Sequence, residues 1–351
     1  MKLPVLFIGL GLLASCSKSD MNQAPAVPLV THQDSVIAKK DTTEDVYIVG
    51  QTNSQVGYFK NSQFIPLATG SNPLGADMAF SGTDIYVLGQ INDSIGYWKN
   101  GQFNFLAMMD STAPVSIAVV GTDVFSLIQA QTGHWSGYLY QNTDFYTELP
   151  TSNQPGLTSI YAIGADLYVP GSNSGFHSNA VYWLNGVANQ LPNTRSPGHA
   201  YDITVDGADV YAVGSVYDFT DSTEIATYWK NSVPFYLSDS LSFGRIYYVS
   251  IVNGDSYMAG YQAAGNAAQY KSPVSVVVWK NGIASHITPV GYSDDIQGFA
   301  VNGSDVYVSV ISSIPGGSLG SPRYYKNGVA VNYTGTTLGY GSRIFVRARS
   351  H

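Results

Sequence analysis

The chain has 351 residues, of which 44% are hydrophobic and 11% are charged, and its formal net charge is −8. This composition is typical of a globular protein with a sizeable core and argues against a disordered chain. Five of the sixteen Lys and Arg residues stand at or near one position of an internal repeat. Because this leaves no basic patch, no nucleic-acid partner is predicted.

Residues 1–15 are predicted to be a lipoprotein signal peptide. Residues 1–2 form a short charged start, Leu3–Leu13 is an apolar run too short to span a bilayer, and Ala14-Ser15 precede Cys16. This junction resembles the lipobox of bacterial lipoproteins, which implies cleavage before Cys16, acylation of that residue and attachment to a membrane of the cell envelope. The alternative is an ordinary signal peptide with an incidental cysteine. Since Cys16 is the only cysteine, no disulfide is predicted.

Residues 16–43 are interpreted as the lipidated cysteine and a flexible tether. The segment is rich in Ser, Asp, Gln, Pro and Thr and has no sustained hydrophobic periodicity. In the alternative interpretation, Pro28–Thr31 adds an edge strand to the following domain.

Residues 44–351 carry seven copies of one motif, in which an aromatic residue is followed two places later by asparagine. The asparagines are Asn61, Asn100, Asn142, Asn185, Asn231, Asn281 and Asn327. A strand-like Gly-x-Asp-Val-Tyr segment precedes each copy, and the period is about 40 to 50 residues, as in propeller blades. The predicted fold is therefore all-β: a seven-bladed β-propeller of four-stranded blades, acting as a monomer.

The repeated residues are predicted to be structural. Asn-Gly pairs such as Asn100-Gly101 favour two-residue hairpin turns with positive φ, and the aspartates that recur beside glycine are expected to bond nearby backbone amides. Four tryptophans share one register position, where large rings pack between blades: Trp98, Trp183, Trp229 and Trp279.

The ends of the repeat region predict how the ring closes. The first repeat begins at Asp45 without an inner strand, whereas Ser342–Arg347 reads as an inner strand with nothing after it. The C-terminal strand is thus predicted to complete the first blade, which would leave no exposed edge between the first and last blades.

Length variation between repeats is concentrated where the second strand of a blade joins the third, and the longest junction is in the sixth repeat. Insertions at one topological point map to one face, which is where repeat proteins usually bind. The candidate ligand-binding residues are Trp135, His177, Tyr217, Asp218, Phe219, Tyr261, Tyr270 and Arg323. The loops of nearly constant length that share this face add residues such as His199, Tyr201, Arg245, Tyr247 and Asp295.

No catalytic constellation, cofactor or metal site is predicted. No Gly-x-Ser-x-Gly, phosphate loop, HExxH or cysteine pair occurs. His134, His177 and His199 lack the close spacing of metal ligands. Asp294 and Asp295 could supply carboxylates for glycoside hydrolysis. Asp77 and Asp202, at equivalent inner-strand positions, could hold a cation or bond exposed backbone.

Repeats of the form Gly-x-Asp-Val-Tyr followed by Tyr-Trp-Lys-Asn-Gly resemble a family of secreted or lipid-anchored bacterial β-propeller proteins, mostly uncharacterised. The resemblance implies the fold and an envelope location. The predicted function is a lipid-anchored module that recognises a glycan or an envelope protein through the variable face. The alternatives are a polysaccharide-acting enzyme, a glycosidase or lyase using loop carboxylates, and a scaffold subunit of an envelope complex.

Overall fold

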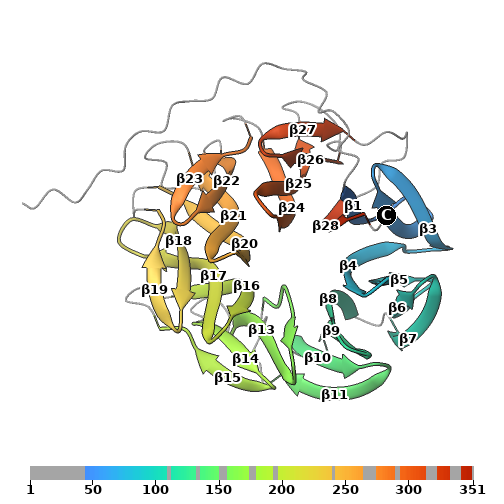
Figure 1. Ribbon diagram of the computed structural model, residues 1–351. Coiled ribbons are helices and arrows are strands. Elements are labelled where there is room, and N and C mark those ends of the chain that lie inside the picture. The colour runs from blue at the N-terminus through green and yellow to red at the C-terminus, as the bar shows by residue number, and fades with distance from the viewer. Residues whose placement is uncertain are drawn as a thin grey trace, which may run out of the picture. The chain divides into compact units, whose positions relative to one another are not determined.

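The chain divides into two units, Met1–His32 and Gln33–His351, and every residue described below belongs to the second. The computed structural model describes the following ranges: 44–108, 112–131, 135–149, 156–173, 179–192, 197–238, 242–263, 274–288, 293–313, 322–332 and 341–349. These residues form seven four-stranded antiparallel sheets arranged as the blades of a propeller (Figure 1).

The four strands of each blade follow one another from the inside of the ring outwards. Blade one contains β28 (Gly341–Ala348), β1 (Glu44–Gln51), β2 (Gln55–Lys60) and β3 (Gln63–Thr69). Blade two contains β4 (Leu74–Ser81), β5 (Asp84–Ile91), β6 (Ser94–Lys99) and β7 (Gln102–Met108). Blade three contains β8 (Thr112–Val120), β9 (Asp123–Gln131), β10 (Trp135–Gln141) and β11 (Asp144–Leu149). Blade four contains β12 (Tyr161–Ile163), β13 (Asp166–Ser172), β14 (Ala180–Leu184) and β15 (Val187–Gln190).

The last three blades follow the same plan. Blade five contains β16 (Gly198–Asp206), β17 (Asp209–Asp218), β18 (Thr223–Lys230) and β19 (Val233–Tyr236). Blade six contains β20 (Gly244–Val252), β21 (Asp255–Ala263), β22 (Val274–Lys280) and β23 (Ile283–His286). Blade seven contains β24 (Ser293–Asn302), β25 (Asp305–Ser313), β26 (Pro322–Lys326) and β27 (Val329–Asn332).

The ring closes through blade one, as predicted. The inner strand β28 pairs antiparallel with β1, with Ile344 opposite Ile48. Ile344 is 2% exposed and packs with Tyr307 of blade seven. Tyr307 and Lys326 of blade seven both donate hydrogen bonds to the Glu44 carboxylate at the start of β1. One strand from the end of the chain and three from its beginning therefore share one sheet.

Large aromatic side chains pack between neighbouring blades, which confirms their predicted role. The four register-matched tryptophans are at most 2% exposed. Trp279 of blade six shares a buried cluster with Val213 and Ala226 of blade five, and Trp229 Nε1 donates to the Pro192 carbonyl at 2.9 Å. Each buried ring removes a large apolar area from water, worth about 25 cal/mol per Å².

The two kinds of tight turn lie at one end of the strands, and we call that side the turn face. Every motif asparagine has a positive φ and accepts, through Oδ1, the backbone N–H that follows the repeat aspartate. Its Nδ2 donates to the aspartate Oδ1, at 2.8 Å for Asn100 and Asp84. The prediction that the aspartates bond backbone amides is therefore wrong: the asparagine makes that bond and the aspartate holds the asparagine.

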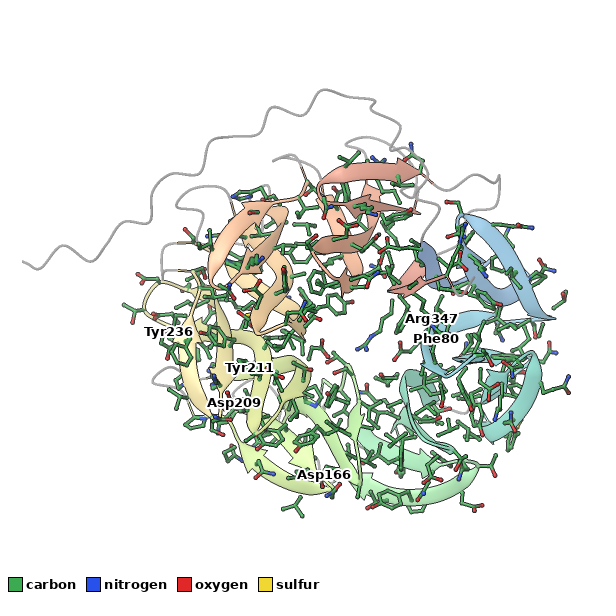
Figure 2. The ribbon with its side chains drawn as sticks, viewed as in Figure 1. Phe80, Asp166, Asp209, Tyr211, Tyr236 and Arg347 are labelled. Atoms are coloured by element: carbon green, nitrogen blue, oxygen red, sulfur yellow. The ribbon has the colours of Figure 1, made fainter. Side chains whose placement is uncertain are left out.

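In five blades a lysine completes this turn. Lys230 Nζ lies 2.7 Å from Asp209 Oδ2 and 5.1 Å from the ring centroid of Tyr211, two residues labelled in Figure 2. The hydrogen bond from Lys230 and then the one from Asn231 lower the pKa of Asp209. The lysine, aspartate, asparagine and tyrosine of the repeat thus form one interlocked unit at the turn face.

Opposite the turn face lies the loop face, which carries the junctions between second and third strands and between blades. In blade five the extra length at that junction forms strand rather than loop. β17 and β18 stay paired as far as Asp218 and Thr223, and only residues 219–222 form the turn. This paired β17–β18 extension, with its turn, is called the blade-five hairpin. The corresponding residues of blades six and seven, 264–273 and 314–321, lie outside the described residues.

Candidate functional site

The structure places the described members of the predicted ligand-binding set at several points of the loop face. Trp135 is the first residue of β10, while His177 and Tyr270 lie outside the described residues. Arg323 lies in β26, and its Nε is buried with no hydrogen-bond partner in the described part of the chain. That these residues bind a ligand remains a prediction.

The structure brings Tyr217 and Phe219 together on the blade-five hairpin. Their ring centroids are 5.0 Å apart in an edge-to-face arrangement, and Phe219 is 59% exposed. Asp218 between them accepts a hydrogen bond from the Thr220 N–H at 2.8 Å, which shapes the turn. Tyr261 lies elsewhere: it is 7% exposed, and its hydroxyl donates to Asp295 Oδ1 at 2.8 Å.

The inner strands share a bulge that determines what stands at the channel mouth on the loop face. In blades two, three, five, six and seven the inner strand shifts register against its neighbour at one position, and in blade one it shifts between Gly341 and Ile344. Bulges re-aim side chains and are common beside functional sites. The residues at the bulge are Ala76, Val115, Tyr201, Tyr247 and Gln297. The residues two places before it are Leu74, Ala113, His199, Arg245 and Asp295.

These two register positions divide the ring into unlike sectors. Blades two and three place only small or aliphatic side chains there, whereas blades five to seven place tyrosine, histidine, arginine, glutamine and aspartate. The second set except Gln297, with the residues that contact it, is called the loop-face cluster: His199, Tyr201, Ser215, Glu224, Arg245, Tyr247, Tyr261 and Asp295. The cluster is an asymmetric feature in an otherwise repetitive ring.

Aromatic rings connect the cluster across the seam between blades five and six. His199 stacks near Tyr201 at 6.0 Å between centroids, Tyr201 lies 4.8 Å from Tyr247, and Tyr247 meets Tyr261 edge-to-face at 5.5 Å. Burial lowers the pKa of His199. The imidazole is therefore neutral at pH 7.

An ion pair joins blade five to blade six beside these rings. Arg245 donates from Nε and Nη2 to the two carboxylate oxygens of Glu224, and from Nη1 to the Tyr247 hydroxyl at 3.1 Å. The Ser215 hydroxyl donates to Glu224 Oε2 at 2.8 Å. Both charged side chains are about one-fifth exposed. A bidentate pair held at this many points is rigid and electrically neutral.

The pair joins the blade-five hairpin, through Glu224, to Arg245 of blade six. Tyr217 is opposite Glu224 in the β17–β18 register, and residues directly opposite in a sheet project from the same face. Since Glu224 reaches Arg245 of β20, that face is turned toward blade six. Tyr217, with Phe219 packed against it, therefore extends the same surface outward from the ion pair.

The central channel contains a second polar arrangement. The Asp77 carboxylate, 1% exposed, accepts hydrogen bonds from Ser116 Oγ at 2.5 Å and from the Ile117 N–H at 3.1 Å in the next blade. Asp202 Oδ2 similarly accepts the Val249 N–H at 3.1 Å. Arg343 of β28 lies 3.6 Å from Asp77 and donates to the Thr158 carbonyl at 3.1 Å.

The cation considered for Asp77 and Asp202 is thus supplied by the chain itself, as the Arg343 guanidinium. Removal from water raises the pKa of Asp202, and Arg343 opposes that rise. Among the described residues no group of three His, Cys, Asp or Glu could hold a metal ion. A cavity of about 430 Å³ lies on the turn-face side of Arg343 and is lined by Phe80, Arg347 and other residues. Arg347 lies 4.7 Å over the Phe80 ring, as can be followed in Figure 2.

Comparison with known proteins supports the fold and leaves the activity open. No family model and no curated protein matches the chain. Among solved structures, the β-propeller domain of the Trilobed protease from Pyrococcus furiosus is 11% identical, with a TM-score of 0.52, over 84% of this chain and 95% of that one. A putative TolB from Agrobacterium tumefaciens is 10% identical, with a TM-score of 0.45, over 88% and 99%.

The first of these likenesses shows a propeller fold and no more. That propeller is described as having an open velcro topology, whereas β1 and β28 of this chain pair in one blade. The chain defines a closed seven-bladed propeller, and its resemblance to the Tyr-Trp-Lys-Asn-Gly repeat proteins stays a prediction.

Proposed function

We propose that the protein is a binding module of the bacterial cell envelope that recognises a glycan or a protein through the loop face of blades five to seven. The observation that carries this proposal is a difference in side chains at the channel mouth: blades two and three place small or aliphatic residues there, whereas blades five to seven place polar and aromatic ones. A propeller repeats its blades for structural reasons, so residues that depart from the repeat in adjacent blades, at matched positions on one face, indicate a binding site. The loop-face cluster satisfies each of these conditions.

The envelope location is part of the proposal and depends on Cys16. Cleavage before Cys16 and acylation of its thiol and amine would anchor the protein, because each buried methylene contributes about 0.8 kcal/mol and several chains act together. No helix among the described residues is long and apolar enough to cross a membrane. Mass spectrometry of the N-terminal peptide, together with Cys16→Ser, tests the anchor: the wild-type chain should partition into detergent, and the variant should not.

The binding proposal is tested by screening the full chain, purified in detergent, against envelope and extracellular glycans and against envelope proteins. Ligand binding that disappears on substitution within the loop-face cluster supports it. Binding that survives all such substitutions refutes the location of the site.

A polysaccharide-acting enzyme is the second candidate, because carboxylates and a neutral histidine share one sector. Glu224 argues against it, since hydrogen bonds from Arg245 and Ser215 already engage both of its carboxylate oxygens. A general acid or base must be within hydrogen-bond reach of the proton that it transfers to or from the substrate. Release of reducing ends or of unsaturated products from a polysaccharide panel would favour the enzyme.

A further inference from the structure

We infer that the loop-face cluster takes a neutral glycan, with Phe219 and Tyr217 as an aromatic wall and the Glu224–Arg245 pair as a polar floor. The inference rests on the proposed binding function and names its ligand class. A pyranose ring has an apolar face of C–H groups and an equator of hydroxyls. It therefore fits a site that places an exposed aromatic ring beside fixed hydrogen-bonding groups.

The wall is built by the length of the blade-five hairpin. In blade two the corresponding strands end at a two-residue turn, Asn92-Asp93. In blade five the pairing continues to Asp218 and Thr223, and the additional residues carry Tyr217 and Phe219. Phe219 is more exposed than buried, although a large apolar ring gains free energy from burial. A ligand that covers it recovers part of that free energy.

The floor is ordered before any ligand arrives. Three hydrogen bonds from Arg245 and one from Ser215 fix both charged groups. A ligand therefore meets donors and acceptors that lose little conformational entropy on binding. Carboxylate and guanidinium groups form stronger hydrogen bonds with hydroxyls than neutral groups do.

The charge balance of the sector selects against acidic ligands. Glu224 neutralises Arg245 in a bidentate pair, and burial keeps His199 neutral. Asp295 adds a negative charge at the same channel mouth. At the floor of this site, a uronate or sialate carboxylate would thus meet a neutral ion pair and a nearby carboxylate, on a chain of formal net charge −8.

The same features favour a glycan over a protein partner. A standard protein interface needs about 800 Å² per partner with an apolar centre and few charged residues. The described floor consists instead of an ion pair, hydroxyl groups and partly exposed tyrosines beside one strongly exposed ring. A basic peptide, attracted by the negative charge, is the alternative that the test must separate.

The first experiment measures binding of the full chain, in detergent, to an array of neutral oligosaccharides, uronate- or sialate-bearing oligosaccharides and basic peptides. Preference for neutral glycans supports the inference. Preference for acidic glycans, or binding of basic peptides alone, overturns the inference of a neutral glycan. Either result leaves the proposed binding function intact. If the chain binds none of the three ligand classes, the result counts against both the inference and the proposed binding function.

The second experiment uses two variants. Phe219→Ala should weaken binding of the best neutral glycan at least tenfold, whereas Phe235→Ala, an exposed ring on β19 of the same blade, should leave it unchanged. Glu224→Gln leaves the Arg245 charge uncompensated, so binding of acidic glycans should rise at least tenfold relative to neutral ones. Equal effects of the two phenylalanine variants, or unchanged charge selectivity in Glu224→Gln, would overturn the inference. Thermal melts of each variant show whether the fold is retained.

Discussion

Replacing Arg343 with methionine should destabilise the whole ring, because the guanidinium lies in the channel where blades meet. Asp77 is 1% exposed and Arg343 is 22% exposed. Methionine fills a similar volume but leaves the two channel carboxylates without their cation. Removing one partner of a buried ion pair typically costs 3–5 kcal/mol. Since Arg343 is partly exposed, we expect about 3 kcal/mol, at the lower end of that range.

A loss of this size lowers the melting temperature by about 6 °C, at about 2 °C per kcal/mol for a domain this large. Differential scanning calorimetry of the two proteins measures it. Arg347→Met is the matched control, because Arg347 lies on the same strand and lines the channel cavity, but its guanidinium stacks over Phe80 instead of pairing with Asp77. It should cost less than about 1 kcal/mol.

The destabilisation caused by Arg343→Met should depend on pH, and the pKa of Asp202 determines in which direction. The folded-state pKa of Asp202 is raised, so the stability linked to its protonation is present at low pH and is lost as the pH rises through that pKa. Without Arg343 this loss becomes larger. Arg343→Met should therefore be more destabilising at pH 7 than at pH 4, and adding Asp77→Asn should restore part of the stability. A loss below about 1 kcal/mol at pH 7, or no restoration, would refute the reasoning.

Three further predictions concern the scaffold. Trp279→Ala empties an inter-blade cluster and should cost about 3–5 kcal/mol in chemical denaturation, whereas a loss below about 1 kcal/mol would contradict the packing account. Gly214→Ala should also destabilise the fold in the same assay, because a Cβ there would lie 1.8 Å from the His199 carbonyl oxygen; an unchanged midpoint would show that blade five relaxes easily. The pKa of Asp255 is lowered by hydrogen bonds from Asn281 and Lys280, so its contribution is present at neutral pH and lost as the pH falls through the folded-state pKa. Asp255→Asn should therefore narrow the stability difference between pH 7 and pH 2, and an unchanged difference would argue against the turn-face unit.

The repeat made the fold predictable, because each blade uses the same local chemistry. Asn100-Gly101 indicates a hairpin turn by itself, and Trp98 lies in a register that recurs in other blades. The pairing of Ser342–Arg347 with the first blade followed from counting strands. These inferences need only residue type and spacing.

The site was less predictable, because its contacts join blades that are far apart in sequence. Arg245 was recognised as a loop-face residue, but nothing in its spacing from Glu224 indicates a bidentate pair across a seam. Likewise, the Arg343 side chain reaches Asp77 only because the C-terminal strand completes blade one. The bulge that places Tyr201 and Tyr247 side by side also depends on strand register, which propensity does not specify.

A long junction between two strands in the sequence does not always form a loop in the structure. The blade-five junction reads as an insertion, yet its residues extend β17 and β18 as a paired hairpin. Thr223 and Glu224 hide the strand pattern in the sequence, because both are polar although Thr223 is buried, so hydrophobicity does not follow burial there.

The central claim is that ligand binds at the loop face between blades five and six. Hydrogen–deuterium exchange of the full chain, with and without the glycan that binds best on the array, tests it most directly. We expect slower exchange in β16–β18 and β20–β21, with the turn face and the outer strands unchanged. Protection confined to the turn face or to blades two and three would contradict the account.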